Sequence, residues 1–72
     1  MTKTRRVAAN TVDTGSTTFE PGVVEINDGL AVATEPLTEE RAATEWLGGT
    51  ITLKPNANGT ALEAYHNGKR IK

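Results

Sequence analysis

The predicted fold is organised around residues 22–34, where the pattern of apolar and polar positions predicts two strands. Two apolar, β-prone runs flank Asn27-Asp28-Gly29, which has the composition of a tight hairpin turn. A two-residue loop would place the apolar residues of the first run opposite alanines. A three-residue loop gathers four large apolar side chains on one face, pairing Ile26 with Leu30 and Val24 with Val32. Because the buried face determines strand register, we predict the three-residue loop.

The same alternation predicts further short strands on both sides of this hairpin. They cover residues 5–12, 16–20, 50–54, 60–66 and 69–71. Placing Val12 opposite Ser16 would bring Ala9 against Phe19. Near the C-terminus, Asn67-Gly68 is the strongest signal for a two-residue turn. It predicts two cross-strand pairs, Ala64 with Ile71 and Tyr65 with Arg70.

Residues 39–47 fit two structures, and the sequence leaves both open. Thr38 suits a helix N-cap, and apolar residues up to Leu47 recur at helical spacing. The alternative is an irregular crossing that plugs the sheet with Trp46 and Leu47. Since the chain has only one Trp, one Phe and one Tyr, we expect Trp46 to fill the core. The alternative role for Trp46 is an anchor for a partner.

These elements predict a single small β domain spanning residues 1–72. We expect a mainly β fold, a small antiparallel β-sandwich or open barrel of six or seven short strands, with a short helix near 39–47 as the open alternative. A chain of this length buries only about 60% of its unfolded surface, so the core is small. The predicted core residues are Val7, Phe19, Val24, Ile26, Leu30, Val32, Trp46, Ile51, Leu53 and Leu62.

Charge is unevenly distributed although the formal net charge is only −1. Basic residues open and close the chain, and acidic residues dominate between Asp13 and Glu45. If the two ends were adjacent, they would form a basic patch, which makes weak nucleic-acid binding an alternative function. Solvated strand edges are the simpler interpretation. No apolar run approaches membrane-spanning length, so we expect a cytoplasmic protein without membrane contact.

Few residues are suited to catalysis. The chain has no cysteine and one histidine, so we expect no metal site and no cofactor. The run from Asp13 to Ser16 matches the aspartic protease signature, but that chemistry needs two carboxylates and hence a dimer around Asp13. A turn is the simpler role. We therefore predict no catalytic residues and no enzymatic activity. The candidate interaction surface comprises Trp46, Tyr65 and Arg70, with a cation–aromatic contact between the last two.

One segment resembles a known family. It comprises Ala9-Asn10-Thr11-Val12-Asp13, then residues 22–33 and Pro36. This pattern resembles the opening of metal-dependent amidohydrolases such as dihydroorotases, imidazolonepropionases and N-acetylglucosamine-6-phosphate deacetylases. The resemblance implies a small β-sandwich that precedes a catalytic barrel in that family. The His-x-His pair that binds the family's metal has no counterpart here, so no catalytic residue carries over.

The whole chain also resembles small uncharacterised proteins of gut bacteria, from which no function carries over. We therefore expect a non-catalytic structural or protein-interaction module that acts as a homodimer or beside a larger protein. The aspartic hydrolase and the nucleic-acid binder remain alternatives. The homodimer is suggested by Val23, an apolar residue on the face opposite Val24 and Ile26, where a solvated strand usually carries charge.

Overall fold

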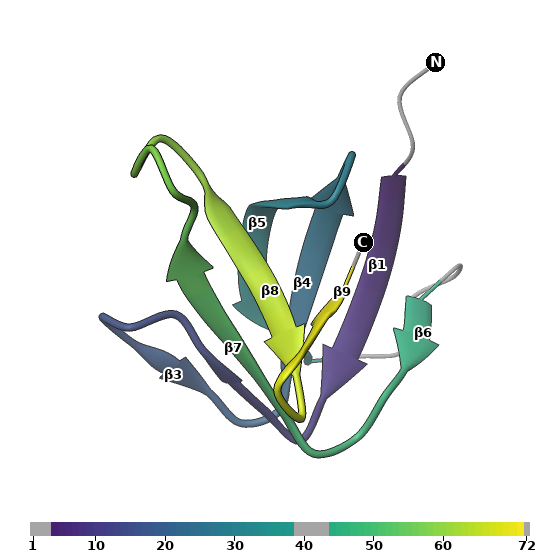
Figure 1. The fold of residues 1–72 in the computed structure, drawn as a ribbon. Helices are drawn as coiled ribbons and strands as arrows, with labels where there is room; N and C mark the ends of the chain where they lie inside the picture. Colours follow the sequence, from purple (N-terminus) through teal and green to yellow (C-terminus); the bar gives the residue numbers. More distant parts are fainter. Residues whose placement is uncertain (1–3, 39–43, 72) are drawn as a thin grey trace.

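The computed structural model describes residues 4–38 and 44–71, and within them it contains nine strands and no helix. Figure 1 labels most of these strands along the chain. Their bounds are β1 (Thr4–Ala9), β2 (Thr11–Asp13), β3 (Thr18–Phe19), β4 (Gly22–Asn27), β5 (Leu30–Pro36), β6 (Thr44–Trp46), β7 (Thr50–Pro55), β8 (Leu62–His66) and β9 (Lys69–Ile71). The described residues contain no helix long and apolar enough to cross a membrane.

All described strands belong to one mixed sheet, in the order β3-β2-β7-β8-β5-β4-β1-β6, with β9 paired to β8. Most pairs are antiparallel, but β1 pairs with β6 and β2 with β7 in parallel. The predicted mainly β fold is confirmed. The described part of the chain has more strands than the six or seven expected, and two parallel pairs that the hairpin signals did not indicate.

The parallel pairs arise from two matched bends. The predicted strand over residues 5–12 bends at Asn10, and a second bend lies at Gly48 and Gly49, where φ is +69° and +61°. The Asn10 Oδ1 accepts a hydrogen bond from the Gly49 amide at 2.8 Å, and the Thr11 amide donates to the Gly49 carbonyl at 3.1 Å. Both chain segments therefore turn together, and Figure 1 shows the sheet folding at this level into two diverging halves.

The core lies on the inner face of this folded sheet. Its buried residues are Val7, Ala9, Val12, Val24, Ile26, Ile51, Leu53, Ala64 and Ile71, with Phe19, Ala31, Leu47 and Leu62 packed against them. Gly22 allows the closest approach, since an added Cβ would lie 2.7 Å from Val12 Cγ2 and 2.9 Å from Phe19 Cβ. Most of the predicted core is confirmed, although Leu30 is only half-buried.

Two predicted core residues, Val32 and Trp46, are instead exposed, each to 57%. Trp46 pairs with Ala8, whereas Glu45 pairs with Val7. Since side chains alternate between the faces of a strand, Trp46 lies on the face opposite the core. The expectation that Trp46 plugs the core was wrong.

The central hairpin, β4–β5, has a two-residue turn rather than the predicted three-residue loop. Asp28 and Gly29 both have positive φ, +53° and +82°, which suits the right-handed twist of paired strands. Ile26 therefore faces Ala31. A bulge follows, in which Val32 is the extra residue on β5, and Val24 then faces Thr34. The bulge explains why Val32 leaves the core.

The C-terminal hairpin, β8–β9, has the predicted register. Ala64 pairs with Ile71 and Tyr65 with Arg70, across a turn in which Asn67 and Gly68 have φ of +54° and +82°. The prediction for the first hairpin was wrong, because Val12 pairs with Phe19 instead of Ser16.

Of the two alternatives left open for residues 39–47, the helix is wrong for its last part, because Thr44–Trp46 form β6. Residues 39–43 lie outside the described residues. The helical spacing of the apolar residues was misleading here, since parallel pairing with β1 determines the conformation of this segment.

We expected the terminal strands, residues 5–12 and 69–71, to form the sheet edges; β9 is an edge, since it pairs only with β8 among the described strands, but β1 is internal. β1 lies between β4 and β6, and the two ends of the sheet path are β3 and β6. Val23 is only 2% exposed within the single chain. The observation that suggested a homodimer is therefore removed, although the oligomeric state itself stays a prediction.

Candidate functional site

The three predicted surface residues do not form one cluster. Tyr65 on β8 and Arg70 on β9 are cross-strand partners. Trp46 lies on β6 at one end of the sheet, and β6 lies apart from β8 and β9 in Figure 1. Next to Trp46, the Leu47 amide donates to the Ala8 carbonyl at 2.8 Å, which extends the pairing of this segment with β1 by one residue. Two separate surfaces must therefore be considered.

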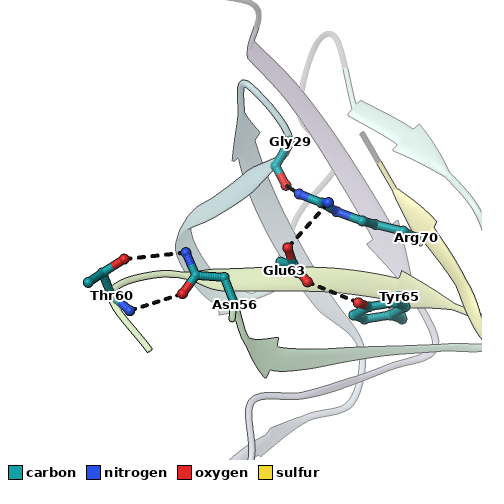
Figure 2. A network of polar contacts seen from close by, with 6 residues as sticks. All are labelled: Gly29, Asn56, Thr60, Glu63, Tyr65 and Arg70. Carbon is teal, nitrogen blue, oxygen red and sulfur yellow. Dashed lines mark hydrogen bonds and ion pairs between the residues drawn. The ribbon is translucent and has the colours of Figure 1, made fainter. Parts of the chain in front are cut away.

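Polar contacts around Glu63 connect the C-terminal and central hairpins, as Figure 2 shows. The Tyr65 hydroxyl donates to Glu63 Oε1 at 2.9 Å, and Arg70 Nη1 forms an ion pair with Glu63 Oε2 at 3.2 Å. Arg70 Nη2 also donates to the carbonyl of Gly29 at 3.2 Å. The carboxylate of Glu63 thus orients both predicted surface residues of this hairpin. Sequence reasoning missed Glu63, although its position two residues before Tyr65 places both on one strand face.

The predicted cation–aromatic contact exists with a different cation. The ammonium of Lys54 lies 5.3 Å from the centre of the Tyr65 ring, whereas the guanidinium of Arg70 is paired with Glu63. Lys54 faces Glu63 across β7–β8, two pairs away from the pair formed by Tyr65. The hydrogen bond to Glu63 raises the pKa of Tyr65, with desolvation and the charge of Glu63 adding to the effect and Arg70 opposing it.

A hollow of about 260 Å³ opens between β1 and the C-terminal hairpin, and we call it the basic hollow. It is lined by Arg5, Leu47, His66, Lys69, Arg70 and Ile71. Ile71 belongs to the core and Leu47 packs against it, so these two supply an apolar floor. The other four supply basic groups, and no described residue lining the hollow is acidic. The two basic chain ends identified in the sequence do therefore meet, at a cavity rather than through strand pairing.

Two contacts fix the walls of the basic hollow. Arg5 Nε and Nη2 donate to the two carboxylate oxygens of Glu45 at 3.1 and 3.0 Å. This bidentate pairing lowers the pKa of Glu45. On the other side, His66 Nε2 lies 2.9 Å from the Gly48 carbonyl. Because a carbonyl can only accept, His66 must donate through Nε2. The histidine that had no predicted partner thus connects β8 to the bend before β7.

A second hollow, of about 240 Å³, lies where β5 separates from β8. These strands share only the pair Ala31 and Leu62 among the described residues, so most of β5 has one unpaired edge. Exposed Val32 and buried Leu53 line this hollow. It is mainly apolar in its side chains and contains no titratable group among its described lining residues.

Asp13 has a local structural role. Its Oδ1 accepts a hydrogen bond from the Gly15 amide at 2.9 Å, and Thr14 Oγ1 accepts one from the Thr17 amide at 3.0 Å. These contacts close the turn between β2 and β3, as the turn interpretation of this motif predicted. Nothing in the structure favours an aspartic hydrolase.

The residues present do not fit the metal site that the amidohydrolase resemblance implies. Within residues 4–38 and 44–71, no group of three histidine, aspartate or glutamate side chains is arranged to hold a metal ion. His66, the single histidine of the chain, is engaged through Nε2 with a backbone carbonyl. We therefore derive no metal-dependent step.

A solved structure supports the resemblance. The chain is similar to N-acetyl-D-glucosamine-6-phosphate deacetylase from Mycobacterium smegmatis, determined as a mutant in complex with N-acetyl-D-glucosamine-6-phosphate. The identity is 30% and the TM-score 0.57, over 74% of this chain but only 14% of the deacetylase chain. No protein-family model and no curated protein matches the sequence. The chain therefore resembles a segment of an amidohydrolase, as residues 8–36 predicted.

Proposed function

We propose that this protein is a non-catalytic interaction module that works in the cytoplasm beside a larger protein or as a homodimer. The observation that carries the proposal is the extent of the match: most of this chain corresponds to a small part of a much larger enzyme. A segment that packs within a larger chain in one protein has surfaces suited to packing against another chain.

Exposed apolar side chains support the proposal. Trp46 and Val32 are the large hydrophobic residues exposed among the described residues. Trp46 lies on an end strand, β6, whose second edge has no partner within the described sheet. Tryptophan is enriched among residues that dominate binding energy at interfaces. We therefore assign the main contact with the partner to Trp46.

Affinity capture with matched variants tests the proposal. Trp46→Ser and Val32→Ser remove side chains of equal fractional exposure from different strands. We expect both variants to melt like the native protein, and Trp46→Ser to lose a protein that the native chain and Val32→Ser both capture from native lysate. Sedimentation at micromolar concentration distinguishes a partner from a second copy of the chain. Equal capture by all three forms would contradict the role of Trp46.

An activity assay tests the non-catalytic part. The native chain, incubated with Zn²⁺ and N-acetylglucosamine-6-phosphate, is expected to release no acetate above the buffer control. Acetate release that rises with protein concentration and is lost in His66→Ala would overturn the proposal.

A further inference from the structure

We propose that the basic hollow binds an acidic segment of a partner protein, with a carboxylate at the rim and an aliphatic side chain on the floor. This inference rests on the proposed function, because it names the kind of partner sequence recognised. It concerns a surface other than that of Trp46, which lies on the opposite sheet face.

Charge complementarity identifies the occupant. The rim carries Arg5, His66, Lys69 and Arg70. Arg5 is already paired with Glu45 and Arg70 with Glu63, both carboxylates of the same chain. Lys69 is exposed, and the Arg5–Glu45 and Arg70–Glu63 pairs leave its positive charge unbalanced. A partner that places a carboxylate beside Lys69 therefore has complementary charge at the rim of the hollow.

The apolar floor favours a peptide over a free anion. Leu47 is half-buried and Ile71 is 7% exposed, and both lie against the core. A small anion at the rim would leave this floor in contact with water. A segment that alternates acidic and aliphatic residues covers the floor and satisfies the rim together, as ligand sites commonly combine an apolar lining with a few polar groups.

The side chains that line the basic hollow are held by contacts within the chain before any ligand binds. The bidentate Arg5–Glu45 pair fixes one wall, and the His66 contact with the Gly48 carbonyl fixes the other. Arg70 is held by both Glu63 and the Gly29 carbonyl. Side chains that are already ordered lose less conformational entropy when a ligand binds.

Peptide titrations followed by amide NMR of the full chain test the assignment. The probe is the peptide Gly-Glu-Leu-Glu-Gly with blocked ends, and its controls replace both Glu by Gln or the Leu by Ala. We expect saturable shifts at Lys69, Arg70 and Ile71, and about fivefold weaker binding for the Gln peptide. The Ala peptide should bind about threefold weaker, because it buries less apolar surface. Equal binding by all three peptides, or no saturable shift at millimolar peptide, would overturn the proposal.

Two variants locate the site. Lys69→Gln and Lys54→Gln each remove one positive charge, but Lys54 lies beside Tyr65 rather than in the basic hollow. We expect Lys69→Gln to weaken the acidic peptide two- to fivefold and Lys54→Gln to leave it unchanged. Equal weakening would indicate a general charge effect and contradict the site. Inorganic phosphate that saturates the same amides more tightly than the peptide would replace the peptide assignment with a small-anion site.

The outcomes separate this inference from the proposed function. If the peptide binds the basic hollow but neither a partner nor a second copy is found, the interaction module fails. If a partner is captured through Trp46 while Lys69→Gln and the peptide titration show no effect, the module stands and the acidic ligand is wrong.

Discussion

The central and C-terminal hairpins share almost the same turn but differ in the strands that follow it. Asp28-Gly29 has φ of +53° and +82°, and Asn67-Gly68 has +54° and +82°. After Asn67-Gly68 the strand pairing is regular. After Asp28-Gly29 a bulge follows, and Val32 is exposed there. Turn residues therefore determine loop length, but the packing around each strand determines how far the register continues.

The central hairpin contains both a buried and an exposed apolar residue, because of its bulge. Ile26, 1% exposed, lies in the core, and Val32 lies outside it. We expect Ile26→Ala to lower the free energy of unfolding by about 2–5 kcal/mol and Val32→Ala to change it by less than about 0.5 kcal/mol. Urea unfolding of both variants measures the difference. A large loss in Val32→Ala would show that the bulge does not expose this side chain.

Replacing each turn glycine by alanine tests whether the two turns are energetically equivalent. Gly29 and Gly68 have the same positive φ, which costs a residue with a Cβ about 1–2 kcal/mol. Gly29→Ala and Gly68→Ala should therefore reduce the free energy of unfolding by similar amounts in urea titrations. A much larger loss in Gly29→Ala would indicate that the bulge adds strain to the central turn.

The smallest expected effect concerns the contacts that join the hairpins. Tyr65 is the only tyrosine, so its phenolate absorbance can be followed alone. Its pKa is raised mainly by the hydrogen bond to Glu63 and is opposed by Arg70. We expect Glu63→Ala to lower the pKa of Tyr65 and Arg70→Gln to raise it further. Shifts in the same direction would contradict this arrangement.

The same shift gives a pH dependence. Because the pKa of Tyr65 is higher in the folded state than its ordinary value of 10.0, the folded chain retains the proton more strongly. The stability associated with this proton is complete below pH 10.0 and is lost as pH rises through the folded pKa. In Glu63→Ala this alkaline loss should diminish, which thermal melts at increasing pH would detect.

The sequence predicted correctly those features that depend only on residues adjacent in the chain. Asn67-Gly68 fixed its own turn and hence the pairs of β8–β9. The predicted register of β4–β5 was wrong. It was chosen to pair Val24 with Val32, and it did not allow for a β-bulge with an extra, unpaired residue on β5. Trp46 was misplaced because the sheet face on which it lies depends on the parallel pairing of β6 with β1. No local sequence pattern predicts this pairing.

The candidate site was predicted in part for the same reason. The basic chain ends and the residues Tyr65 and Arg70 were visible in the sequence. The hollow they surround depends on contacts between distant segments, such as Arg5 with Glu45, which are 40 residues apart. Glu63, which orients Tyr65 and Arg70, could have been found from strand alternation alone.

The matched bends at Asn10 and Gly49 also imply an order of assembly. The C-terminal hairpin closes over two residues, whereas the Asn10–Gly49 contact joins positions 39 residues apart. Loop-closure entropy rises with separation, and non-local pairing slows folding, so we expect the bends to meet late. The basic hollow has Arg5 and Leu47 on one side and Lys69 and Ile71 on the other. A chain that has formed only its hairpins lacks this hollow, so the partner proposed above would select molecules that have finished folding.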